Sequence, residues 1–115
     1  MPTFSTAQAV IAAGESLSTT VDCTAQGTSA IAGIIFPDDW NSAPLTFQIS
    51  ADNIKYADLY HLDGRDPGVA VIPGGAVIIP PEPARGMRYI KLRSGTRDNP
   101  VNQNAERTFE IILVA

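Results

Sequence analysis

Apolar and polar residues alternate in several short runs of the chain. In PLTFQIS, Leu45, Phe47 and Ile49 alternate with hydroxyl and amide side chains. The same period of two recurs in ESLSTTVD (15–22), RYIKLRS (88–94) and RTFEIILV (107–114). Successive side chains of a β-strand point to opposite faces, so each run predicts a strand with one buried face and one solvent-facing side.

Further strand candidates are TAQAVIA (6–12), AIAGIIF (30–36), IKYADLYH (54–61), VAVI (69–72) and AVII (76–79). Turn-forming residues separate these runs, as at Ala13-Gly14, Pro37-Asp38-Asp39 and Asp63-Gly64. Ala51-Asp52-Asn53 predicts a tight hairpin turn, because Asn and Asp tolerate left-handed backbone. No window shows a helical period with caps.

Many short strands separated by turns favour an all-β fold. We predict an antiparallel β-sandwich, jelly-roll-like, with about eight or nine short strands. A chain of 115 residues has the size of one domain, so residues 1–115 are expected to form a single sandwich.

Two of the predicted strands are apolar on both faces. They are AIAGIIF and the end of RTFEIILV, where Ile112 and Val114 alternate with Ile111 and Leu113. A strand of this kind is expected to be covered on both sides. The second cover could be a loop, a terminal strand or another subunit.

The segment 67–86 is rich in proline and glycine, and Glu82 and Arg85 are its only charged residues. Proline cannot donate to a strand ladder, so we expect short or edge strands with fixed bends here. The segment could wrap one side of the sandwich. It could instead be an arm that places Val77 and Ile78 on a neighbouring subunit.

The charges are unevenly spread along a chain whose net charge is −4. Residues 1–54 hold five acids and no Lys or Arg, whereas residues 55–115 hold eight basic residues against seven acids. The basic cluster consists of Arg85, Arg88, Lys91, Arg93 and Arg97. Because the isoelectric point is about 4.7, we expect this cluster to meet an acidic protein surface, or the acidic half of another copy, and not nucleic acid.

Residues that could do chemistry are few. His61 and Cys23 are the only histidine and cysteine, and no nucleophile elbow is present. We therefore expect no enzyme, no zinc site and no cofactor. Aspartates such as Asp63 and Asp66 match no calcium-binding loop and are interpreted as turn residues.

The remaining composition bears on location and on a possible ligand. No run approaches the ~18 apolar residues of a membrane-spanning helix. The first residues, MPTFSTAQAV, show no basic region followed by a long apolar run, so we expect no export signal. We expect a soluble protein made in the cytoplasm, with no membrane partner. Trp40, beside Asp38 and Asp39, either contacts a glycan or packs over the end of the sandwich.

Several segments together resemble small all-β virion proteins of tailed bacteriophages. In chain order they are GESLSTTVD, FPDDW, LTFQISADN, YADLY, RYIKLRSGT and PVNQNAERTFEIIL. The resemblance runs from about Gly14 to Leu113. The chain departs from it where Asn53 stands in place of an expected Gly, and the segment 67–86 matches least.

The resemblance implies a structural role in the virion. The favoured prediction is a capsid decoration (cement) protein. It would bind the major capsid protein outside the shell as a homo-oligomer, and a trimer is the favoured oligomer. The alternatives are a tail-, neck- or fibre-associated virion protein and a carbohydrate-binding β-sandwich module.

The polar stretch Arg93–Thr108 connects two predicted strands and holds most of the candidate contact residues. It could cap its own sandwich or fasten this subunit to another. The candidates for subunit or capsid contacts in this stretch are Arg93, Arg97, Asp98, Asn102 and Gln103.

Overall fold

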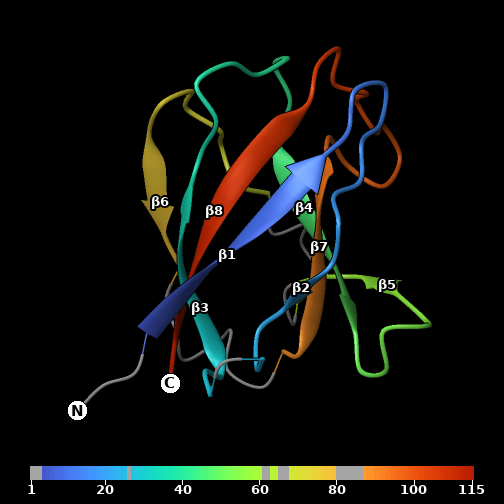
Figure 1. The fold of residues 1–115 in the computed structure, drawn as a ribbon. Helices are drawn as coiled ribbons and strands as arrows, with labels where there is room; N and C mark the ends of the chain where they lie inside the picture. The colour runs from blue at the N-terminus through green and yellow to red at the C-terminus, as the bar shows by residue number, and fades with distance from the viewer. Residues whose placement is uncertain (1–3, 26, 61–62, 65–67, 80–86) are drawn as a thin grey trace.

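The chain folds as a β-sandwich. The computed structural model describes residues 4–25, 27–60, 63–64, 68–79 and 87–115, and its regular structure there is all strand. The strands are β1 (Phe4–Ile11), β2 (Val21–Asp22), β3 (Ala30–Ile35), β4 (Leu45–Ser50), β5 (Ala57–Asp58), β6 (Ala76–Ile78), β7 (Tyr89–Ser94) and β8 (Arg107–Val114). Sheet 1 has the order β1-β8-β3-β6 and sheet 2 the order β2-β7-β4-β5 (Figure 1). The predicted all-β antiparallel sandwich is confirmed.

The strand pairings are nested. β1 pairs with β8, β2 with β7, β3 with β6 and β4 with β5, all antiparallel. The chain thus doubles back as one long hairpin, and consecutive strands lie in different sheets except β4 and β5, which both lie in sheet 2.

The alternating runs supply the core between the sheets. Leu45 and Phe47 of β4, and Ile90 and Leu92 of β7, are buried from sheet 2. The matching set from sheet 1 is Ala9, Ile11, Ile34, Phe109, Ile111 and Leu113. Burial of these faces from water is the main favourable term for the fold, and it follows the predicted period of two.

The prediction of a full strand over 15–22 is wrong, because this segment divides its hydrogen bonds between the two sheets. Ser18 N–H donates to Leu92 O in sheet 2 at 2.8 Å, whereas Thr19 N–H donates to Val10 O in sheet 1 at 2.9 Å. Only Val21–Asp22 continues as strand β2. The residues Leu17, Thr19 and Val21 therefore alternate in a segment that crosses from one sheet to the other.

The predicted tight turn at 51–53 is also wrong, although Asn53 has the expected positive φ of 61°. The partner of Ile49 is Ala57, so a longer loop joins β4 to β5. The Asp52 carboxylate accepts hydrogen bonds from the N–H groups of Ile54 and Lys55 at 2.9 and 3.0 Å. These bonds replace a two-residue turn with a wider, internally bonded loop.

Two other predicted strands are shorter than expected. Of the run 54–61, residues 54–60 are described and are strand only at Ala57–Asp58, and the run 69–72 contributes a single bridge between Val69 and Leu45. Val69 exchanges two backbone hydrogen bonds with Leu45, at 2.8 and 2.9 Å. Of the proline- and glycine-rich segment, residues 68–79 are described, and β6 lies within them.

The two strands that are apolar on both faces, β3 and β8, are fully buried on the core side only, and their outer side is partly exposed. Ile111 and Leu113 of β8 are buried, but Ile112 and Val114 are half-buried and Ile35 of β3 is exposed. A Cβ placed on Gly33 would lie 3.5 Å from Ile112 Cδ1. The side chain of Ile112 therefore lies over Gly33, within van der Waals reach of a Cβ at that position.

Candidate interaction surfaces

The outer surface of sheet 2 gathers polar, aromatic and basic side chains. Strand alternation turns Tyr89, Lys91 and Arg93 of β7 outward, because Ile90 and Leu92 face the core. Their partners on β4 are Ser50, Gln48 and Thr46, and Gln48 in turn pairs with Asp58 of β5. We call this surface the polar face.

Arg93 and Asp58 form the centre of the polar face. Arg93 Nε donates to Thr46 Oγ1 at 2.9 Å, and its NH1 group forms an ion pair with Asp58. Arg97 Nε lies 3.5 Å from the second carboxylate oxygen of Asp58. The hydrogen bond from Arg93 is the main reason that the pKa of Asp58 lies below its usual value.

Arg93 is buried, which bears on its predicted role as a partner contact. Its side chain is 9% exposed, whereas that of Arg97 is 64% exposed. Arg93 is already bonded to Thr46 and Asp58 and has little exposed surface, so Arg97 is the better placed of the two. A hydrogen bond with Tyr60 is the main cause that raises the pKa of Arg97.

Tyr56 joins three segments on the polar face. Lys91 Nζ lies 4.4 Å from the centre of the Tyr56 ring, close enough for a cation–π interaction. The Tyr56 hydroxyl is 2.9 Å from Thr20 Oγ1 and also donates to Asn53. The loop after β4 is thereby tied across β7 to the segment before β2.

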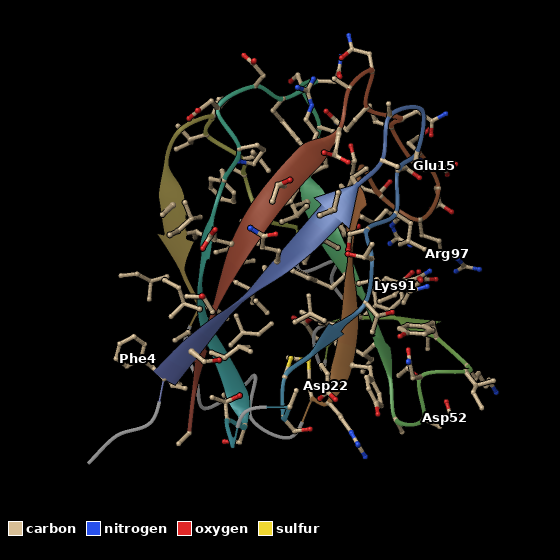
Figure 2. The ribbon with its side chains drawn as sticks, in the orientation of Figure 1. Phe4, Glu15, Asp22, Asp52, Lys91 and Arg97 are labelled. Atoms are coloured by element: carbon tan, nitrogen blue, oxygen red, sulfur yellow. The ribbon has the colours of Figure 1, made fainter. Side chains whose placement is uncertain are left out.

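The polar face carries all three tyrosines of the chain. Arg88 lies 4.8 Å from the centre of the Tyr89 ring, and Tyr60 is exposed. Figure 2 shows Lys91 and Arg97 on the same side of the molecule. Aromatic rings beside cations can contact an acidic protein surface or the polar groups of a ligand.

The loop after β7 is held by Gln103, which is fully buried. Gln103 Nε2 donates to Ser94 Oγ at 2.8 Å and to Asn41 O at 3.1 Å. Gln103 Oε1 accepts from Asn41 N–H at 2.8 Å and from Arg107 Nε at 3.0 Å. Gln103 therefore fastens the loop to its own sandwich, and the prediction that it contacts a partner does not fit its burial.

Other predicted contact residues of this loop lie at the surface. Arg97, Asp98 and Asn102 are exposed. Gly95 has a φ of +91°, and a Cβ there would meet Asn99 O at 2.3 Å. Glycine is therefore required at 95 for the backbone to turn where the exposed part of the loop begins.

Trp40 packs over the end of the sandwich, one of its two expected roles. Its ring meets Phe109 edge-to-face, with centroids 5.3 Å apart. Its Nε1 donates to Ala43 O at 3.0 Å. These contacts leave the half-buried Trp40 poorly placed as a platform for a sugar ring.

The outer surface of sheet 1 has a different composition. Phe4 is 72% exposed and Ile78 is 84% exposed, at opposite strands of the sheet. Between them lie the half-buried Ile112 and Val114 and the exposed Ile35. We call this surface the apolar face; Figure 2 shows Phe4 on the side of the molecule away from Lys91 and Arg97.

The two candidate residues of the proline- and glycine-rich segment point to opposite sides. Val77 is half-buried and packs against the core, whereas Ile78 points outward on the apolar face. Ile78 is therefore available to a neighbouring subunit, and Val77 supports the fold of its own chain.

Reactive groups do not converge in the part of the chain that the structure describes. Cys23 is fully buried, and burial raises the pKa of its thiol to about 11. Among the described residues, no three His, Cys, Asp or Glu side chains are grouped to hold a metal ion. His61, Asp66 and Arg85, which the sequence analysis considered, lie outside the described residues.

No described helix is long and apolar enough to cross a membrane.

Sequence reasoning missed the partners that organise the polar face. Asp58 was not among the predicted contact residues, yet it pairs with Arg93 and Arg97. Asn41 was not singled out, although its backbone and side chain hold Gln103, Asn104 and Arg107. The strand register, which brings residues 35 to 66 positions apart together, is the signal that was lacking.

The chain has no counterpart among the known proteins compared: no family model, no curated protein and no solved structure matches it.

Proposed function

We propose that the protein is a non-enzymatic structural component of a tailed-bacteriophage particle, a capsid decoration protein that binds the outside of the shell. The observation that carries the proposal is the pair of unlike outer faces on one sandwich. One surface exposes the apolar side chains of Phe4, Ile35 and Ile78, and the other exposes basic and aromatic side chains. A molecule of this kind can contact two different neighbours at once, as a protein that bridges capsomers must.

The proposed partner is the major capsid protein, and the polar face with its neighbouring loop is the proposed capsid side. Arg97 and Tyr60 are exposed there, and Arg88 and Lys91 add positive charge. An acidic or polar patch of the shell would complement this charge. The apolar face would then serve contacts between copies, and the trimer implied by the resemblance stays a prediction.

Particle-binding measurements test the proposal. We expect a triple variant, Arg97→Ala with Asp98→Ala and Asn102→Ala, to lower the occupancy of purified particles. Its melting temperature should stay nearly unchanged, because these side chains are exposed. Binding equal to that of the native chain would contradict the proposed capsid side.

Gln103→Ala is the matched comparison within the same loop. This change leaves buried partners of Gln103 without a hydrogen bond, so we expect a loss of about 1–3 kcal/mol in the free energy of unfolding. A variant that weakens particle binding through instability can thus be told from one that removes a contact.

Copy number separates the decoration role from its alternative. Quantitative mass spectrometry of purified particles should find the protein at many copies, comparable with the number of capsomers. A few copies per particle would favour a tail, neck or fibre position and would overturn the decoration role.

A further inference from the structure

The four edges of the two sheets differ sharply in length. The edge strands are β1 and β6 in sheet 1, and β2 and β5 in sheet 2. Three of them have only two or three residues, whereas β1 has eight. Short edges are one of the devices by which proteins prevent unwanted strand pairing, and β1 lacks this device.

β1 also lacks the other common protections of an edge. Its sequence, FSTAQAVI, contains no proline and no charged residue. Its register with β8 runs without a bulge from Phe4 to Ile11. Proline, lysine and bulges are what usually blunt an exposed edge, so β1 is a regular strand open to a partner.

The hydrogen bonds of Val10 show which backbone groups face that edge. Val10 N–H donates to Thr19 Oγ1 at 3.0 Å, and Val10 O accepts from Thr19 N–H at 2.9 Å. Both groups of Val10 thus point away from β8. In an antiparallel strand the two groups of a residue point to one side, and the side alternates along the chain.

This alternation shows to which side the backbone groups of the other β1 residues point. Ser5, Ala7 and Ala9 direct their backbone groups to β8, and Phe4, Thr6 and Gln8 direct theirs to the open edge. No hydrogen bond between these edge groups and another described residue is seen beyond Val10. The side chains of Phe4, Thr6 and Gln8 are exposed, so the edge is accessible to a second strand.

We propose that two copies of the chain pair antiparallel through this edge, around a two-fold axis at Thr6. In this register Thr6 lies opposite Thr6 of the second copy, and Phe4 lies opposite Gln8. Each of the three residues would donate one backbone hydrogen bond and accept one. The two copies of sheet 1 would then form one continuous sheet.

The β1 strand of a second copy is a better pairing partner for this edge than any other described edge strand of the chain. β2, β5 and β6 are too short to pair along Phe4–Gln8, so β1 is the matching edge that another molecule offers. Because β1 carries no charge, the two paired strands place no like charges opposite each other. Thr opposite Thr is also a favourable cross-strand pair.

The inference is independent of the proposed role on a capsid and differs from the trimer that the resemblance implies. A two-fold contact gives a dimer, and light scattering separates a dimer from a trimer by mass. One strand pair buries less than the roughly 1,000 Å² of a typical stable interface, so the dimer should be concentration-dependent. Salt should not weaken it, because the paired strands contain no ion pair to screen.

Amide hydrogen exchange on the native chain gives a residue-level test. At concentrations where light scattering finds the dimer, the amides of Thr6 and Gln8 should be protected along with those of Ala7 and Ala9. On dilution to monomer, Thr6 and Gln8 should lose protection while Ala7 and Ala9 keep it. A chain that stays monomeric at NMR concentration, with Thr6 and Gln8 unprotected, would overturn the proposal, and so would protection that survives dilution.

Substitutions at Thr6 test the same contact by mass. Thr6→Pro removes the central N–H donor at a position where an edge strand tolerates proline, and the apparent mass should fall to that of a monomer. Thr6→Lys places two like charges opposite each other and should have the same effect without removing the amide. Thr6→Val is the matched control, which keeps the donor and the branched shape and should remain dimeric.

One further control separates edge pairing from packing of the apolar faces. Ile78→Lys lies at the far edge of sheet 1 and should leave the dimer intact. Loss of the dimer in Ile78→Lys, with retention in both folded Thr6→Pro and Thr6→Lys, would show that the faces associate instead and would overturn the edge model.

Discussion

Both outer faces of the sandwich result from the alternation of side chains along the strands, but the outward side chains of the two sheets differ in their contacts. On sheet 2 the outward residues are bound to one another, as Arg93 is to Asp58 and Lys91 is to the ring of Tyr56. On sheet 1 the outward residues include exposed apolar side chains such as Phe4 and Ile78. The polar face is therefore partly a component of the fold, whereas the apolar face is available for contacts.

This difference separates residues that hold the chain together from residues that can hold it to something else. Position on an outer face does not decide the matter, because Arg93 is outward-facing by alternation and yet buried. What decides it is whether bonds to other parts of the chain hold the side chain buried, as they do for Arg93 and not for the exposed Arg97. Substitutions on the two faces should accordingly affect different measurements.

Among substitutions on the two outer faces, the largest effect on stability is expected at the centre of the polar face. Asp58→Asn removes the negative charge that pairs with the buried guanidinium of Arg93. Leaving a buried charged donor without its partner should cost about 1–3 kcal/mol in the free energy of unfolding, measured by urea denaturation. Asp98→Asn, at an exposed aspartate of the neighbouring loop, is the control and should change stability by less than about 0.5 kcal/mol.

A related effect is expected from acid. The pKa of Asp58 is lower in the folded chain than its ordinary value, mainly because of the hydrogen bond from Arg93. The folded state therefore binds fewer protons than the unfolded state, and the stability from this pair is fully present above pH about 4. It should be lost as the pH falls through the depressed pKa of the folded chain, and the loss should be shallower in Asp58→Asn.

A smaller effect is expected where Tyr56 ties the loop after β4 to the segment before β2. Tyr56→Phe keeps the ring over Lys91 but removes the hydrogen bonds to Thr20 and Asn53. We expect a loss of about 1 kcal/mol in thermal or urea unfolding. Faster amide exchange of Asn53 and its neighbours should accompany it, and unchanged exchange there would show that the tie does not hold the loop.

The smallest effect on stability is expected on the apolar face. Ile78→Ser changes a side chain that is 84% exposed, so the free energy of unfolding should stay within about 0.5 kcal/mol of the native value. Retention on a hydrophobic-interaction column should fall. The same change at buried Ile111 should cost about 3 kcal/mol or more, and equal losses at both positions would contradict the assignment of the two faces.

The sequence was a good guide to the core and a poor guide to segments held by non-local bonds. The period of two predicted the inward faces of β4, β7 and β8, because burial of one strand face imposes that period. It did not show that 15–22 crosses between the sheets, since the acceptors of Ser18 and Thr19 lie on different strands. It also could not show that Asp52 builds a wider loop in place of a tight turn.

The predicted contact residues divide in the same way, into exposed side chains and side chains that non-local bonds hold in the fold. Arg97, Asp98, Asn102 and Ile78 are exposed, as contact residues must be, and whether they bind a partner stays a prediction. Arg93 and Gln103 were chosen for their polarity, and polarity is also what buried network residues possess. Their burial depends on Asp58 and Asn41, which lie 35 and 62 positions away.

The thiol of Cys23 can report whether the sandwich has opened. Its thiol is fully buried with a pKa raised to about 11, so an alkylating reagent at neutral pH should react only with molecules whose sandwich has opened. Because the chain has a single cysteine, each opened molecule gains one label. The mass spectrum of a mixed sample would then count opened and closed molecules directly, without separating them.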